Sequence, residues 1–147
     1  MVKNTAALLM VMLALVGACR AKGKQAVRAE KQESIEQVGK EIGLTFPAGT
    51  KLIGVDRERG ADDMIAVKVE MPVAAWPAFL RTTPIDPSAF SPGERGLLGP
   101  DHDFWDPHQA KNLHTAQTAL PGARVLNLGY DNRPGDMMAV FVVNHGT

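Results

Sequence analysis

The sequence predicts an α+β domain, in which a four-stranded antiparallel sheet is built from two similar β-hairpins and carries helices on one face. Three observations lead to this prediction. Two segments of similar sequence, at about residues 49–71 and 122–144, are 73 positions apart, the first of them alternates apolar with polar residues, and helical apolar spacing occurs beside them. Two hairpins side by side make a sheet wide enough to hold a hydrophobic face.

The first predicted element is a helix over about residues 26–42. Ile35, Val38 and Ile42 recur at helical spacing and form one apolar stripe. Gly43 follows directly, where a residue with left-handed backbone commonly ends a helix.

The two similar segments match in one register without a gap. Residues 49–53 (GTKLI) correspond to 122–126 (GARVL), and 63–69 (DMIAVKV) correspond to 136–142 (DMMAVFV). Each segment is predicted to form a strand, a polar turn and a second strand, because the intervening residues are those that reverse a chain. The alternative is a coincidental likeness between two amphipathic hairpins.

The second strand of each hairpin shows which face is buried. Ile65, Val67 and Val69 alternate with residues 66, 68 and 70, a pattern typical of a strand with one face on the core and one towards water. In the second hairpin, Phe141 and Val143 make the other face apolar too. That strand is therefore predicted to be central or covered on both faces.

Two more helices are predicted between the hairpins. One covers about residues 73–81 (VAAWPAFLR). The other begins after Asp106, where Asp106 suits the N-cap and Pro107 the first helical position, and residues 120–122 (LPG) end it.

The segment between these helices, residues 82–105, is long, rich in proline and glycine, and without periodicity. Such loops are often functional. Its apolar residues are typical of interface anchors, so the segment is a candidate partner-binding patch. The alternative is that they fold back beside the core. The candidate residues are Phe90, Leu97, Leu98, Phe104 and Trp105.

The N-terminus is typical of an export signal: a positive head with Lys3, an apolar run over residues 6–16, and the small residues Gly17 and Ala18 before Cys19. This ending resembles the lipobox of bacterial lipoproteins. The resemblance implies removal of residues 1–18 and a lipid on the sulfur of Cys19. The small, polar residues 20–26 predict a lipidated tether over 19–26, and the remaining length is enough for one domain, over 27–147. The resemblance also implies a location in the cell envelope, and Arg20 favours the periplasmic face of the outer membrane.

Composition limits the function. Cleavage at Cys19 removes Lys3 and leaves 15 basic against 16 acidic side chains, a balance that argues against nucleic-acid binding. The lipidated Cys19 is the chain's only cysteine, so the sequence predicts neither a disulfide nor a catalytic thiol.

The cluster at residues 101–108 (DHDFWDPH) contains the one candidate metal site, formed by His102, Asp103 and His108. It lacks a known ligand spacing, and a polar lead-in to a helix is the alternative. The sequence predicts no cofactor and no catalytic centre. As a small envelope lipoprotein, the chain is expected to bind a protein, as an inhibitor or immunity-type module does. A small-ligand or metal-binding lipoprotein and a structural envelope protein are the alternatives.

Overall fold

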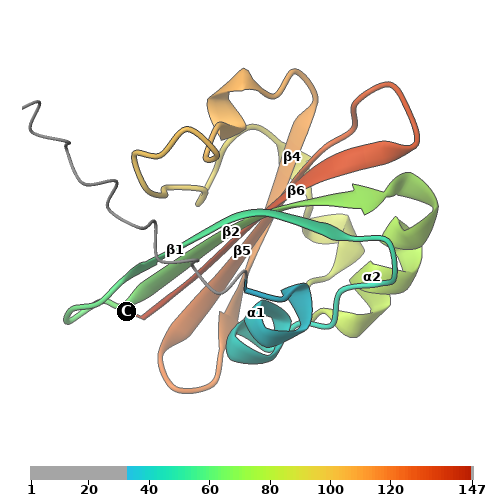
Figure 1. Ribbon diagram of the computed structural model, residues 1–147. Coiled ribbons are helices and arrows are strands. Elements are labelled where there is room, and N and C mark those ends of the chain that lie inside the picture. The colour runs from blue at the N-terminus through green and yellow to red at the C-terminus, as the bar shows by residue number, and fades with distance from the viewer. Residues whose placement is uncertain (1–32, 147) are drawn as a thin grey trace, which may run out of the picture. The chain divides into compact units, whose positions relative to one another are not determined.

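The computed structural model describes residues 33–146, which form an α/β fold around one antiparallel sheet. The sheet has six strands, two more than predicted, and their order is β1-β2-β6-β5-β4-β3. Figure 1 shows the course of the chain. The elements are α1 (Ile35–Ile42), β1 (Lys51–Glu58), β2 (Met64–Pro72), η1 (Val73–Ala75), α2 (Trp76–Thr82), η2 (Pro87–Ala89), β3 (Ser91–Pro92), η3 (Pro107–Gln109), β4 (Leu113–Leu120), β5 (Arg124–Asp131) and β6 (Met137–Gly146).

Helix α1 is fixed at both ends by its own sequence. The Ser34 hydroxyl accepts a hydrogen bond from the Gln37 backbone N–H, and the Gln37 side chain accepts one from the Ser34 N–H, which together make a capping box. Gly43 ends the helix with a φ of 73°, as predicted. The predicted stretch over residues 26–32 lies outside the described residues.

The two similar segments form the hairpins β1–β2 and β5–β6. The hairpins join through β2 and β6, where Lys68 lies opposite Phe141. These two residues are themselves 73 positions apart, so they are the corresponding residues of the two segments. The pairing of β2 with β6 is therefore symmetric about the Lys68–Phe141 pair.

The predicted helix after Asp106 is wrong. The chain makes only the single turn η3 and then strand β4, which pairs with β5 along its whole length, from Leu113 opposite Asp131 to Leu120 opposite Arg124. Leu, Ala and Gln favour helices, but propensity is weak and eight residues of strand pairing override it. Nor does the Asp106 side chain cap η3.

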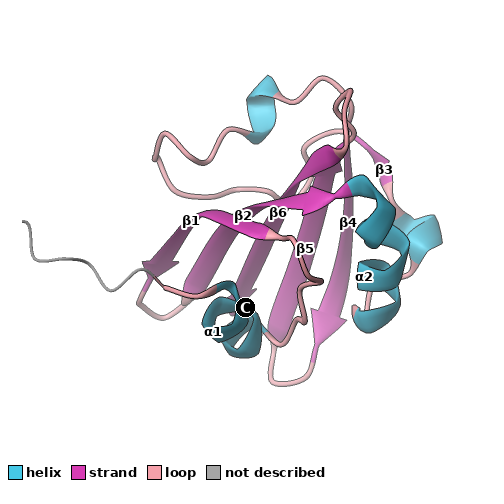
Figure 2. Cartoon of the chain, turned by 45° about the vertical axis from the view of Figure 1, so that its right-hand side comes forward, coloured by secondary structure: helices cyan, strands magenta, loops and turns pink. Residues whose placement is uncertain are grey.

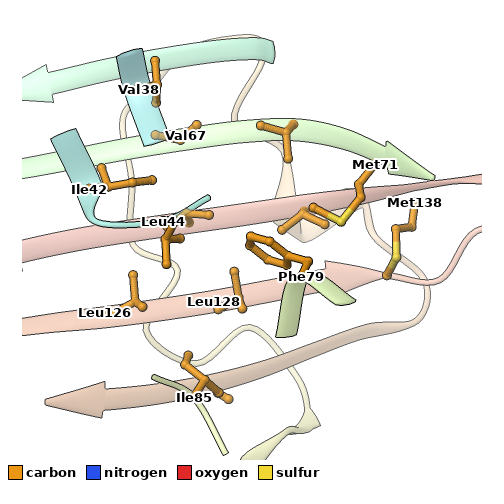
Figure 3. Close-up of a cluster of buried hydrophobic side chains, with 14 residues drawn as sticks. Val38, Ile42, Leu44, Val67, Met71, Phe79, Ile85, Leu126, Leu128 and Met138 are labelled. Atoms are coloured by element: carbon orange, nitrogen blue, oxygen red, sulfur yellow. The ribbon is translucent and has the colours of Figure 1, made fainter. Parts of the chain in front are cut away.

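Both helices cover one face of the sheet, as predicted (Figure 2). Val38 and Ile42 of α1 and Phe79 of α2 pack against the strands in a cluster of buried side chains (Figure 3). The strand residues in this cluster include Val67 and Val69, so the face of β2 predicted to be apolar is the one that lies on the core.

The opposite face is also buried, which the sequence did not predict for β2. Residues 93–112, here called the cover segment, place Leu97 and Trp105 in a second cluster with Ala66 and Phe141. Lys68, expected to face water, is 7% exposed. The prediction for β6 is confirmed, because this strand lies between β2 and β5 and is covered on both faces.

Candidate functional site

Trp105 fastens the cover segment to the sheet. Its ring packs edge-on against Phe141 of β6, with 5.4 Å between the ring centroids. The indole Nε1 donates a hydrogen bond of 3.2 Å to the Leu97 carbonyl oxygen, which satisfies its one polar group inside the cluster. A Cβ at Gly99 would overlap this indole, so only glycine lets the chain pass so close.

An ion pair lies beside this aromatic contact. The Lys68 Nζ of β2 hydrogen-bonds to the Asp106 carboxylate and stands 5.4 Å from the centre of the Phe141 ring. Asp106 thus serves as an ion-pair partner instead of the predicted helix cap. Two adjacent residues of the cover segment, Trp105 and Asp106, therefore contact the two corresponding positions of the hairpins.

The five predicted partner-binding residues do not form one exposed patch. Leu97 and Trp105 are buried beneath the cover segment, and Phe104 is half-buried over Gly54 of β1. Phe90 belongs to the helix-covered face, where it contacts Trp76 and Tyr130. Leu98 alone is fully accessible, at 86%. For the other four residues the alternative interpretation is correct, because they fold back against the sheet.

The three predicted metal ligands also lie at different places on the domain and do not form one site. His102 lies 3.5 Å from the Asp56 carboxylate of β1, measured from Nε2 to Oδ1. His108 borders a different cavity, of about 540 Å³, with Lys111 and His114, and Asp103 is exposed. Within residues 33–146, no three His, Cys, Asp or Glu side chains gather closely enough to hold a metal ion. Cys19 lies outside the described residues.

A small polar pocket, which the sequence did not predict, lies between the cover segment and the sheet. It has a volume of about 200 Å³. Asn127 of β5 is 0% exposed at its wall, and neither its amide nitrogen nor its amide oxygen has a hydrogen-bond partner among the described residues. The lining residues are Ala89, Ser91, Arg95, Gly96, Thr115, Ala116, Gln117 and Asn127.

Strand β1 forms a free edge of the sheet, since among residues 33–146 it pairs only with β2. Its register shifts between Leu52 and Gly54, which leaves Ile53 as an extra residue in a bulge. The Ile53 side chain is 42% exposed, and Ile53 and Leu98 are the two exposed large apolar residues of the described chain.

Next to this edge, Arg57 of β1 bridges two acidic side chains. Its guanidinium donates hydrogen bonds to Glu41 of α1, the shortest 2.6 Å, and to Glu33. Hydrogen bonds from Arg57 lower the pKa of the Glu41 carboxyl below its usual value, and those to Glu41 and Glu33 raise the pKa of Arg57. The first described residues are thereby held against β1.

Comparison with protein families, with curated proteins and with solved structures finds no match for this chain. None of the helices within residues 33–146 is long and apolar enough to cross a membrane.

Proposed function

We propose that this protein is a lipid-anchored lipoprotein of the cell envelope whose domain binds another protein, as inhibitors and immunity proteins do. The observation that supports the proposal is the free edge at β1. An eight-residue edge strand presents unpaired backbone N–H and C=O groups, to which an extended segment of a partner adds as a further strand.

The opposite edge is much less suited to this mode of binding. It is formed by β3, which has two residues, and one of them, Pro92, has no N–H to donate. At β1, the exposed Ile53 supplies an apolar contact near the start of the strand. Lys51 and Glu58 at its two ends are exposed, so a partner segment with an acidic residue opposite Lys51 and a basic one opposite Glu58 fits best.

The lipid proposed on Cys19 would determine the cellular location in which the domain meets its partner. Glu33 follows Cys19 by 14 positions, a length of chain that spans at most about 50 Å when fully extended. A lipid on Cys19 would keep the start of the domain within that distance of the membrane surface, and Glu33 at this start contacts Arg57 of β1. The partner is therefore an envelope protein or a toxin that enters the periplasm.

We further propose that the two hairpins arose from one duplicated unit. β1 and β5 have equal lengths and begin 73 positions apart, and β2 and β6 begin at Met64 and Met137 with the same separation. The symmetric pairing about Lys68 and Phe141 supports this origin.

Site-specific crosslinking tests the binding proposal. A photoreactive amino acid replaces Ile53 or, as the matched control, Leu98, in the full chain expressed in its native envelope. We expect one adduct with a second protein from position 53 and none from position 98, since only position 53 lies on the free edge. With the purified partner, amide hydrogen exchange should slow in β1, and Ile53→Asp should abolish binding while Leu98→Asp preserves it.

Three results would contradict the proposal. They are the absence of an adduct from position 53, the same adducts from both positions, and an adduct with twice the mass of the chain, which would indicate a homodimer at this edge.

A further inference from the structure

A small polar pocket lies beside Asn127. We infer that it binds a small carboxylate that also has a hydrogen-bond donor of its own, that is, a hydroxy acid or an amino acid. This inference goes beyond the proposed function, because the pocket adjoins β4 and β5 whereas β1 is the opposite edge strand of the sheet.

Asn127 shows that the pocket is built for a polar molecule. Buried side-chain amides are almost always hydrogen-bonded, since an unpaired polar group loses its water contacts without replacement. The Asn127 amide is completely buried, and both its donor and its acceptor lack a partner among residues 33–146. A molecule that satisfies this amide must therefore offer both an acceptor and a donor.

The charge of the lining indicates an anion. Arg95 is the only charged residue of the eight that line the pocket, and it forms no ion pair with any residue of the described chain. A guanidinium binds carboxylates in a planar, two-pronged geometry. The remaining polar groups are the hydroxyls of Ser91 and Thr115 and the amides of Gln117 and Asn127.

The volume of the pocket limits the size of the ligand. At roughly 30 Å³ for each water molecule, about 200 Å³ corresponds to six or seven waters. This space holds a molecule the size of lactate or serine and is too small for a nucleotide or a folded peptide.

Gly96 brings the cover segment against the Asn127 amide. Its backbone φ is +71°, a value that residues with a side chain rarely adopt. A Cβ at this position would also overlap the Asn127 side-chain oxygen. The glycine therefore lets the backbone beside Arg95 pack directly on the Asn127 amide, so a ligand that pairs with this amide must displace the chain at Gly96.

Titration of the purified full chain tests the inference. The probes are glycolate, L-lactate, glycine and L-serine, with lactamide, serinamide and sulfate as comparison compounds. We expect saturable binding of at least one of the four carboxylates by calorimetry, together with a higher melting temperature. Lactamide, serinamide and sulfate should each bind at least tenfold more weakly than the best carboxylate, because each lacks one of the two required features.

Variants locate the binding in this pocket. Arg95→Ala should weaken the bound carboxylate at least tenfold, whereas Arg81→Ala, which removes an exposed arginine of α2, should leave the affinity unchanged. Asn127→Leu keeps the volume but removes the amide, and should abolish binding while circular dichroism shows a folded protein.

The inference is overturned if none of the four carboxylates binds saturably, if sulfate binds as tightly as the best of them, or if Arg95→Ala and Arg81→Ala have equal affinities. Ile53→Asp should retain carboxylate binding, so this result is independent of the test of the β1 edge.

Discussion

Lys68 and Phe141 occupy corresponding positions of the two similar hairpins, but one side chain is charged and the other is aromatic. They face each other across β2 and β6, at the centre of the symmetric pairing. The cover segment distinguishes them, because Trp105 packs on Phe141 and Asp106 pairs with Lys68. We expect these two contacts to set the register in which the cover segment crosses the sheet.

A double-mutant cycle tests whether Lys68 and Asp106 stabilise the fold through their direct interaction. Lys68→Met leaves the Asp106 carboxylate without its cation, and we expect a loss of about 3 kcal/mol in the free energy of unfolding, measured in urea. Asp106→Leu should cost a similar amount, since it leaves the ammonium group of Lys68 unpaired at the end of a side chain that is only 9% exposed. The double variant should recover most of the stability. Losses that simply add in the double variant would contradict a direct coupling.

The Arg57 bridge predicts a pH dependence. The folded state lowers the pKa of Glu41 below its usual 4.5, so this carboxylate stabilises the fold above pH 4.5 and ceases to do so as the pH falls through the lowered pKa. We expect Glu41→Gln to reduce the free energy of unfolding at pH 7 by no more than about 1 kcal/mol, because the pair is partly exposed.

Denaturation of wild type and Glu41→Gln between pH 7 and pH 3 measures this effect. The difference in stability should shrink below pH 4.5. A difference that stays constant down to pH 3 would show that Glu41 stabilises the domain through packing and not through its charge.

At the scale of elements, the sequence predicted those that depend on local signals. The end of α1 at Gly43 and both hairpins follow from turn residues and from alternation along the chain, and the double burial of β6 follows from a strand that is apolar on both faces. Strand β4 did not follow, because Asp106 and Pro107 suit the start of a helix and only pairing with β5 selects the extended form.

The packing of the cover segment on the sheet could not be predicted from the sequence for a related reason. Its prolines and glycines indicate a loop, and nothing local shows that Trp105 lies against Phe141, a residue 36 positions later. The polar pocket shares this limit, because Arg95 and Asn127 meet only through the fold. One local signal existed: Asn127 is a polar residue between Leu126 and Leu128 in an apolar strand.

At the scale of the whole molecule, the two proposed binding surfaces lie towards opposite edges of one sheet. The β1 edge adjoins Glu33, the start of the described chain, and the polar pocket adjoins β4. We therefore expect that a protein partner and a small carboxylate would not compete for binding. The role proposed for β1 depends on the lipid that the N-terminal resemblance implies, since only an envelope location brings the edge to its partner.

The most direct test of this account is the intact mass of the native protein extracted from the envelope. We predict a chain that begins at Cys19, carries a lipid on that residue and fractionates with membranes, and we predict that Cys19→Ser prevents both the lipid and the cleavage. A mass that corresponds to an unmodified chain beginning at Met1, recovered from the soluble fraction, would contradict the account.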